Sequence, residues 1–406
     1  MKYLILVGDG MADYPISKLG NRTPLQAAHT PNIDHLCRNG RTGLLRTIPR
    51  GLEPSSDIAN LSILGYDSRR YKFGRGALEA AGRGIPLSST DVAFRLNLIT
   101  ESEGQLDDYS AGQISTSQAL EIIEFLKASI GVPGELDFYG GVGYRHLLVL
   151  RNCPSAAQVC CVPPHHVQGR EIDEILPTSL AQEAQDAVEE LRRMVSASRR
   201  ILENYSTNLA RREQGKKPAN MMWPWGPGRQ PSMPPFQTVH GIRGSAISAV
   251  DIIKGIAKLV SMRVIDVPGA TGYFDTDYEK KADYALGELE ESDLVFIHVE
   301  APDEASHEGN CELKIRTIED FDRRLLGRIL DHLDMDFVMS VLPDHYTSLE
   351  SRRHLTDPVP FLVFSTNQKG DRVSSFDEVS VREGSFGLLE GHRLMRVMLE
   401  IERDST

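Results

Sequence analysis

Residues 294–307 read LVFIHVEAPDEASH. The first six residues, Leu294–Val299, are rich in β-branched and aromatic side chains and do not alternate between apolar and polar, which is typical of a strand buried on both faces of a parallel sheet. An acid and a histidine, Asp303 and His307, follow shortly after this run. The segment therefore predicts a central strand with reactive side chains just past its carboxyl end.

Four more runs share this pattern, and helical periodicity fills the sequence between them. The runs are Tyr3–Val7, Met262–Val267, Phe337–Leu342 and Pro360–Phe364. The helical patterns span Thr23–Asn39, Ala246–Leu259, Thr276–Glu291 and Glu312–Leu333. Because strands alternate with helices, we predict an α/β fold with a doubly wound, mainly parallel sheet.

The middle of the chain follows another pattern. Val92–Ile99 and Tyr144–Leu150 alternate in polarity, with a helical pattern at Ser117–Ile130 between them and a longer one from Ser179 to Arg212. The Pro- and Gly-rich stretch Gly215–Pro235 suggests a connection. We therefore expect residues 89–224 to form an inserted, smaller α+β domain that binds substrate, and residues 1–88 and 225–406 to form one metal-binding catalytic domain.

Composition narrows the class of protein. The 406 residues are 40% hydrophobic and 25% charged, as in a folded globular chain, and the net charge of −12 argues against a uniform nucleic-acid-binding surface. The apolar run Tyr3–Val7 is too short for a signal sequence or membrane span. An odd number of cysteines, five, without CxxC spacing, favours a reducing compartment. We expect a cytoplasmic protein that contacts neither nucleic acid nor membrane.

Acids and histidines gather where the predicted strands end. Asp9, Asp303 and Asp344 each follow a strand, and His345 comes directly after Asp344. In an open parallel sheet, ligands bind outside the carboxyl ends of the strands, so three strands would deliver these side chains to one edge. Any single aspartate here could instead be a helix cap or a turn residue. Their grouping favours a metal site.

Two more histidines fit the same edge. His307 lies four residues after Asp303, and His354 lies nine residues after His345, just before another strand. Oxygen ligands combined with imidazoles suit Mn²⁺, Zn²⁺ or Mg²⁺. Two such ions, about 3.5–4 Å apart, could share this set of side chains.

A candidate nucleophile lies in the segment EPSSDIANL, residues 53–61, where a helix should begin. Ser55 or Ser56 could simply cap that helix. The functional alternative is that the Ser56 hydroxyl faces the metal edge, where a cation and the helix N-terminus would both favour its deprotonated form. The same N-terminus would suit a phosphate group. GxSxG, HExxH and GxxxxGK[ST] motifs and a strand-linked GxGxxG motif are absent from the sequence, so ATP- or NAD-dependent chemistry has no support.

Several longer segments carry a family resemblance. They include LILVGDGMAD (residues 4–13), PSSDIANLSILGYD (54–67), VFIHVEAPDEASHEGN (295–310) and LPDHYTSLESRRHLTDPVPF (342–361). In these segments the chain resembles the archaeal-type, cofactor-independent phosphoglycerate mutases of the alkaline phosphatase superfamily. The resemblance extends over nearly the whole chain. It departs from the family pattern at Ser55, where a glycine is usual, and at 346–348, where a proline is frequent.

The resemblance implies two divalent metal ions, with Mn²⁺ expected first and Mg²⁺, Zn²⁺ or Co²⁺ as alternatives. One ion would be held by Asp303, His307 and His354. The other would be held by Asp9, Ser56, Asp344 and His345. Ser56 rather than Ser55 matches the family nucleophile because an acid, Asp57, follows it directly.

Basic and polar residues in the predicted insertion are candidates for binding an anionic substrate, because arginine can hold a carboxylate or phosphate through two parallel hydrogen bonds. An ion pair at the surface is the alternative for each. The candidates are Arg95, Asn97, Arg145, His146, Arg211 and, outside the insertion, Lys254.

The resemblance implies an enzyme that interconverts 3-phosphoglycerate and 2-phosphoglycerate through a phosphoserine intermediate. Three alternatives remain open: a metal-dependent phosphatase, a phosphotransferase acting on another small alcohol such as homoserine, and a binding protein without activity. The sequence leaves the oligomeric state, the metal and the general acid or base undetermined.

Overall fold

The computed structural model describes residues 1–71 and 74–401. These residues form two compact units, and the chain passes between them at Lys72/Phe73 and at Pro231/Ser232. The expected boundaries, 88/89 and 224/225, differ from these. Helix α4 (Arg75–Gly82) and strand β7 (Met221–Gly228) belong to the insertion because both pack against its strand β3 (Val92–Ser102).

The larger unit is built on one sheet, which has eight strands among the described residues. In spatial order they are β15 (Gly387–Glu390), β2 (Arg41–Arg46), β14 (Val359–Ser365), β11 (Phe337–Leu342), β1 (Lys2–Gly8), β10 (Leu294–Val299), β8 (Gly244–Ile247) and β9 (Arg263–Ile265). All neighbouring pairs are parallel except those of β14, which runs antiparallel to β11 and β2. The predicted mainly parallel α/β sheet is confirmed.

The register of the central strands places the site. Gly8 of β1 pairs with Val299 of β10, and Val7 pairs with Leu342 of β11. The three strands therefore end level with one another, and the residues that follow them emerge at one edge of the sheet.

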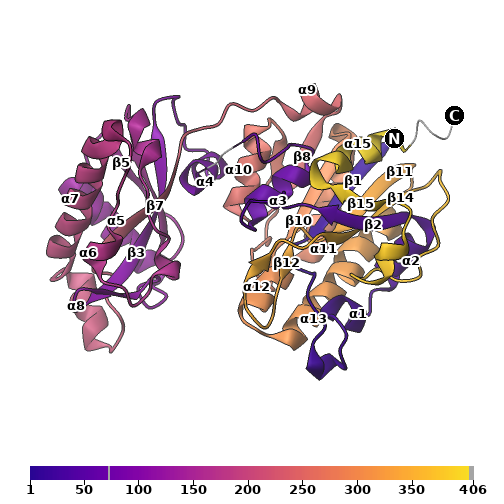
Figure 1. The fold of residues 1–406 in the computed structure, drawn as a ribbon, viewed down its shortest axis with the longest axis horizontal. Coiled ribbons are helices and arrows are strands. Elements are labelled where there is room, and N and C mark those ends of the chain that lie inside the picture. Colours follow the sequence, from indigo (N-terminus) through magenta and orange to yellow (C-terminus); the bar gives the residue numbers. More distant parts are fainter. Residues whose placement is uncertain (72–73, 402–406) are drawn as a thin grey trace. The chain divides into compact units, whose positions relative to one another are not determined.

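Helices cover both faces of this sheet, as Figure 1 shows. One face packs against α2 (Pro31–Asn39), α11 (Tyr278–Glu291), α13 (Cys311–Asp320), the π-helix η5 (Phe321–Gly327) and α14 (Arg328–His332). The other carries α3 (Ser56–Ile63), α10 (Asp251–Leu259) and α15 (Leu394–Glu400). Burial on both faces explains why the central strands lack polar alternation.

Two predicted helices of the larger unit differ from the structure. The pattern at 23–39 splits into α1 (Pro24–Ala27) and α2, because Pro31 disfavours helical geometry at the residue before it. The pattern at 246–259 begins with β8, and its helix starts only at Asp251.

The insertion has its own sheet, with β3 as the central strand. Its other strands are β4 (Gln105–Asp108), β5 (Leu136–Tyr139), β6 (Arg145–Leu150) and β7, and its main helices are α5 (Thr116–Ile130), α7 (Gln185–Leu202) and α8 (Ser206–Glu213). The expected connection at 215–235 contains β7, and the strand that pairs with it among the described residues is β3. Proline has no N–H to donate to a neighbouring strand. An edge strand such as β7 has a neighbour on one side only, and it therefore tolerates proline better than a central strand does.

Candidate metal centre and nucleophile

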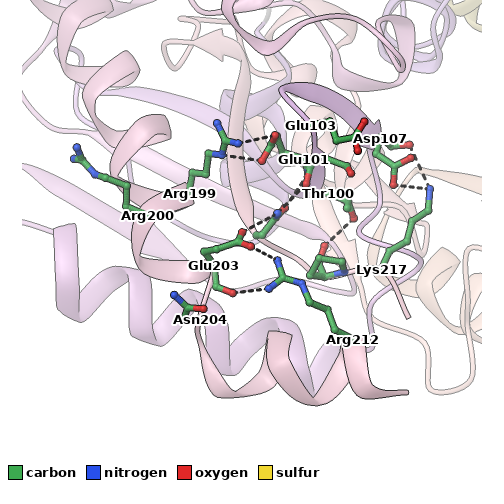
Figure 2. Close-up of a pocket in the computed structure, with 13 residues that line it drawn as sticks. Thr100, Glu101, Glu103, Asp107, Arg199, Arg200, Glu203, Asn204, Arg212 and Lys217 are labelled. Carbon is green, nitrogen blue, oxygen red and sulfur yellow. Dashed lines mark hydrogen bonds and ion pairs between the residues drawn. The ribbon is translucent and has the colours of Figure 1, made fainter. Parts of the chain in front are cut away.

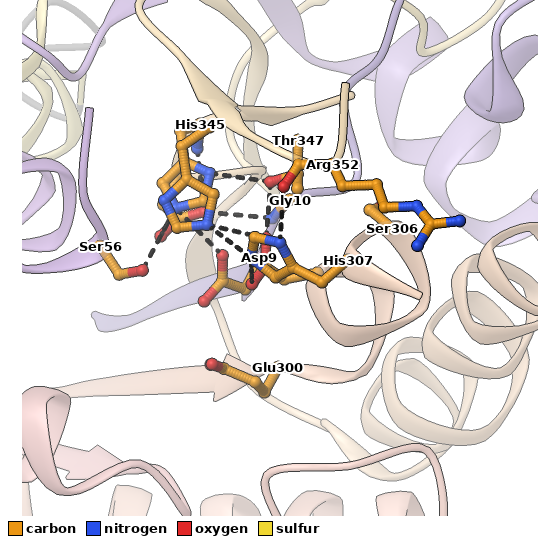
Figure 3. Close-up of polar contacts among 12 residues, drawn as sticks. Asp9, Gly10, Ser56, Glu300, Ser306, His307, His345, Thr347 and Arg352 are labelled. Atoms are coloured by element: carbon orange, nitrogen blue, oxygen red, sulfur yellow. Dashed lines mark hydrogen bonds and ion pairs between the residues drawn. The ribbon is translucent and has the colours of Figure 1, made fainter. Parts of the chain in front are cut away.

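Loops after three parallel strands build the candidate centre in the larger unit (Figure 3). Asp9 follows β1, and Asp344 and His345 follow β11. The loop after β10 enters α12 (Ala301–His307), which carries Asp303 and His307 one helical turn apart. A small hairpin of β12 (Tyr346–Thr347) and β13 (His354–Leu355) returns His354 to the same edge.

The first predicted ligand group converges on one point. His307 Nε2 lies 3.1 Å from Asp303 Oδ2 and 2.9 Å from His354 Nε2. His354 Nε2 lies 3.4 Å from Asp303 Oδ1. Three donor atoms that face one another this closely have the arrangement of ligands around a cation.

The second predicted group lies beside the first, and its two aspartates and its histidine are fully buried. His345 Nε2 lies 3.4 Å from Asp9 Oδ1 and 3.5 Å from Asp344 Oδ2. The rings of His345 and His354 stack with their centroids 3.9 Å apart, so the two groups adjoin. The structure thus brings the aspartates and histidines that the sequence pointed to into one cluster.

Ser56 completes the cluster from another element. It is the first residue of α3, and its Oγ lies 3.2 Å from His345 Nε2. Asn60, one turn later, donates one hydrogen bond to the Ser56 carbonyl and another to Asp344 Oδ2, which ties the start of the helix to the ligand loop. Ser55 is the helix cap but makes no side-chain capping bond. The Ser55 side chain therefore does not cap the helix, and the Ser56 hydroxyl faces His345, where it is available for chemistry.

His298 and Glu300 also belong to this cluster, although the sequence did not single them out. His298 Nε2 lies 3.2 Å from Asp9 Oδ2, and its Nδ1 lies 3.7 Å from Glu300 Oε2. Glu300 follows β10 directly, so the strand-end rule could have found it. His298 lies inside β10 and not after it, so the strand-end rule could not single it out.

Crowded carboxylates shift the proton affinities of the cluster. Burial, followed by the charge of Asp344, raises the pKa of Asp9 well above its usual range. Burial, followed by the charge of Asp303, raises the pKa of Glu300 to about 8. Burial lowers the pKa of His345 to about 4 despite the nearby Asp344. A neutral imidazole among carboxylates that repel one another is a favourable environment for a cation.

Buried polar atoms that lack a hydrogen-bond partner indicate whether the cluster could bind a cation. Both Asp9 oxygens, both His298 ring nitrogens and Glu300 Oε2 are buried without a hydrogen-bond partner among the described residues. Such atoms carry a large desolvation cost unless something binds them. Two of the groupings that could hold an ion are Asp303–His345–His354 and Asp9–His298–Asp344. The residues present therefore fit divalent cations.

Three predicted substrate residues share one face of the insertion's sheet. Arg95 and Asn97 alternate along β3, and Asn97 pairs directly with Arg145 on β6. Trp225 of β7 lies on this face too, opposite Arg95, and its Nε1 donates to Asn97 Oδ1 over 3.0 Å. Arg95 forms an ion pair with Glu79. Its buried Nε–H has no partner among the described residues.

The other predicted substrate residues lie elsewhere. His146 pairs with Leu96 and so points to the opposite face, where burial, followed by the charge of Arg95, lowers its pKa to about 3. Arg211 is buried and donates to the carbonyls of Ala111 and Lys217. Lys254, on α10 of the larger unit, forms an ion pair of 2.6 Å with Asp266. Their roles in substrate binding stay predictions.

A charged cavity of about 710 Å³ lies in the insertion at the C-terminal end of β3 (Figure 2). Three of its four basic residues are already paired with acids. Arg199 binds Glu101, Arg212 binds Glu203 and Lys217 binds Asp107. Arg200 and Glu103 also line the cavity and carry opposite charges, so the lining offers no excess charge to a ligand.

The loops after the central strands bring carboxylates and histidines to one edge of the sheet, and the start of α3 adds a serine. This arrangement defines the protein's class as an α/β protein with a candidate divalent-metal centre. Comparison with known proteins identifies the family. A sequence model of 2,3-bisphosphoglycerate-independent phosphoglycerate mutase matches residues 37–208. A relative of that name, numbered 2, from Methanothermobacter thermautotrophicus is 49% identical, with 98% of each chain covered. One from Methanothrix thermoacetophila is 48% identical over 98% of this chain and 100% of its own. The chain belongs to this family.

Solved structures agree with this assignment. A Pyrococcus horikoshii protein superposes with a TM-score of 0.85 at 30% identity, covering 100% of this chain and 98% of the other. A cofactor-independent phosphoglycerate mutase from Thermoplasma acidophilum gives a TM-score of 0.67 at 29% identity, covering 99% and 100%. Within residues 1–71 and 74–401, no helix is long and apolar enough to cross a membrane.

Proposed function

We propose that this chain interconverts 3-phosphoglycerate and 2-phosphoglycerate by passing the phosphoryl group through Ser56. The observation that carries the proposal is the Ser56 hydroxyl at the start of α3, 3.2 Å from His345 Nε2 and next to the carboxylate–histidine cluster. Relatives that match nearly the full chain bear the name of this activity. We place the reaction in glycolysis, in the cytoplasm.

Ser56 would act as the nucleophile. A bond forms between Ser56 Oγ and phosphorus while the bond from phosphorus to the glycerate oxygen breaks, and the hydroxyl proton ends on that oxygen. The other glycerate hydroxyl then forms a bond to phosphorus while the bond from phosphorus to Ser56 Oγ breaks, and the proton of that hydroxyl returns to Ser56 Oγ. The N-terminal amides of α3 favour the negative charge of the phosphoserine.

Two divalent cations, with Mn²⁺ as the first to test, would be held by the two ligand groups. When bound, they stabilise the charge on the phosphoryl oxygens. The residues of the groups are Asp303, His307 and His354 for one ion and Asp9, Ser56, Asp344 and His345 for the other. Glu300 and His298 add buried donor atoms beside them.

For binding the substrate, the face of the insertion's sheet that carries Arg95, Asn97 and Arg145 is the best supported. The unpartnered, buried Nε–H of Arg95 is a donor that an anion would satisfy. Arg211 and Lys254 are less supported because their donors already have protein partners.

An enolase-coupled assay with 3-phosphoglycerate and Mn²⁺ tests the function. We expect turnover in the wild type, a loss of roughly a thousandfold or more in Ser56→Ala because the covalent step disappears, and bound metal in both. Ser55→Ala is the matched control, since Ser55 makes no side-chain capping bond and should retain activity.

Other outcomes separate the alternatives. Release of inorganic phosphate as fast as isomerisation would indicate a phosphatase, and phosphorylation of homoserine without mutase turnover would indicate a different phosphotransferase. Mass spectrometry of the protein after rapid quenching should find phosphate on Ser56. Wild-type turnover in Ser56→Ala would refute the covalent step.

A further inference from the structure

Thr347, in strand β12, lies where the loops of the candidate centre meet. Its side chain is fully buried. Its Oγ1 lies 2.6 Å from Asp303 Oδ1 and 3.1 Å from His345 Nδ1. One hydroxyl therefore contacts a member of each predicted ligand group (Figure 3).

Counting protons determines the direction of these two bonds. A hydroxyl has one hydrogen to donate, and an ionised carboxylate can only accept. The Thr347 O–H therefore points to Asp303, and the Thr347 oxygen accepts from His345 Nδ1–H. His345 Nε2 then has no hydrogen, and its lone pair faces Ser56 Oγ at 3.2 Å and the neighbouring carboxylates.

The other ligand group uses a comparable contact. His307 Nδ1 lies 3.0 Å from the carbonyl oxygen of Arg352, an acceptor that requires the hydrogen on Nδ1 and leaves Nε2 facing Asp303. That carbonyl orients one histidine only. Thr347 orients His345 and Asp303 together, so its hydroxyl links the two groups.

The loop after β1 packs directly onto this pair. Gly10 has a φ of +63°, and a Cβ at this position would lie 2.6 Å from Thr347 Oγ1 and 2.7 Å from Asp303 Oδ1. The Gly10 amide also donates to Asp344 Oδ1. Only glycine lets the three ligand-bearing loops approach this closely.

We propose that Thr347 is a positioning residue that holds His345 with its Nε2 lone pair toward Ser56 and couples that histidine to Asp303 of the other ligand group. The proposal rests on the proposed function only in taking these groups as cation ligands. Hydrogen-bonded partners behind metal ligands typically change metal affinity by 10–100-fold when removed.

Substitutions can isolate the hydroxyl from the fold. The backbone of Thr347 is held separately, because its amide donates to the Ala12 carbonyl and its carbonyl accepts from the buried Lys314 ammonium over 2.8 Å. Thr347→Val keeps the side-chain shape and these bonds but removes the hydroxyl. Thr347→Ser keeps the hydroxyl. Thr317→Val is the matched control, since Thr317 is a buried threonine of the same unit whose hydroxyl donates, among the described residues, to the helix carbonyl of Lys314.

Mn²⁺ alone is the probe, titrated by calorimetry and electron paramagnetic resonance. We expect Thr347→Val to bind Mn²⁺ roughly 10–100-fold more weakly at both sites, Thr347→Ser to bind within a few-fold of wild type, and Thr317→Val to bind as wild type. Affinity that stays unchanged in Thr347→Val, or falls at one site only, would overturn the coupling.

A second measurement needs no variant. In wild-type protein with ¹⁵N-labelled histidine and no metal, the His345 ring should carry its hydrogen on Nδ1. A hydrogen on Nε2 would overturn the proposal even if Thr347→Val does not fold. Neither measurement uses mutase turnover, so a wild type that binds Mn²⁺ as described but lacks turnover would refute the proposed function and leave this inference standing.

Discussion

The candidate centre and the charged cavity of the insertion both concentrate acids and bases, but they differ in how the charges are partnered. In the cavity, Arg212 and Lys217 each form an ion pair with an acid. In the centre, Asp9, His298 and Glu300 retain buried atoms that form no hydrogen bond among the described residues. The comparison teaches that buried, unpartnered donors and acceptors, rather than the density of charge, point to a ligand site.

The strongest way to break this comparison is to remove one charge from the centre. Asp344→Asn keeps the size of the side chain but loses the negative charge that would hold a cation. Since a metal contributes several kcal/mol to stabilising a phosphoryl transition state, we expect turnover to fall about a thousandfold or more. The coupled assay measures the effect, and elemental analysis should find less metal. Turnover within tenfold of wild type would contradict the assignment of this ligand.

Removing bound cations with a chelator sharpens the comparison, because it should lower the stability of the larger unit and leave that of the insertion unchanged. A cation present at a hundred times its Kd stabilises the folded protein by about 2.7 kcal/mol. Its removal should therefore lower the melting temperature of the larger unit by roughly 5–10 °C. Differential scanning calorimetry with and without a chelator measures this shift. The insertion's transition should not move, and an equal shift in both transitions would count against a centre confined to the larger unit.

The smallest effect is expected in the cavity. Arg212→Ala removes one partner of a half-exposed ion pair with Glu203, and such pairs contribute about 0–1 kcal/mol. We expect the free energy of unfolding in urea to change by less than about 1 kcal/mol and the turnover to match wild type. A large loss of turnover would show that the cavity takes part in the reaction after all.

Much of the centre was predictable because it depends on strand order and on the position of acids after strands. Asp9, Asp303 and Asp344 follow three strands that turn out to be neighbours, so one rule about parallel sheets places all three. His298 could not be found in this way, because it lies within β10 and only the folded structure shows which atoms it faces.

The strands and boundaries of the insertion were harder to predict from the sequence, and particular residues show why. The prolines in β7 argue against a strand unless the strand is known to be at an edge, which only the pairing reveals. His146 and Arg145 are adjacent in sequence, yet the register with β3 sends them to opposite faces. Helix α4 joins the insertion through packing on β3, which its own sequence does not encode.

The pairing of β3 with β7 has a consequence for how this gene could be rearranged. The two strands nearest the crossings run antiparallel, with Ala93 opposite Gly228. A Cβ built on Gly228 would lie 2.6 Å from the Gly74 Cα, so the incoming and outgoing chains nearly touch. A segment whose ends meet can be excised as a cassette and replaced by a short turn without removing a strand from the parent sheet. The two modules are therefore suited to separate expression and to exchange between relatives.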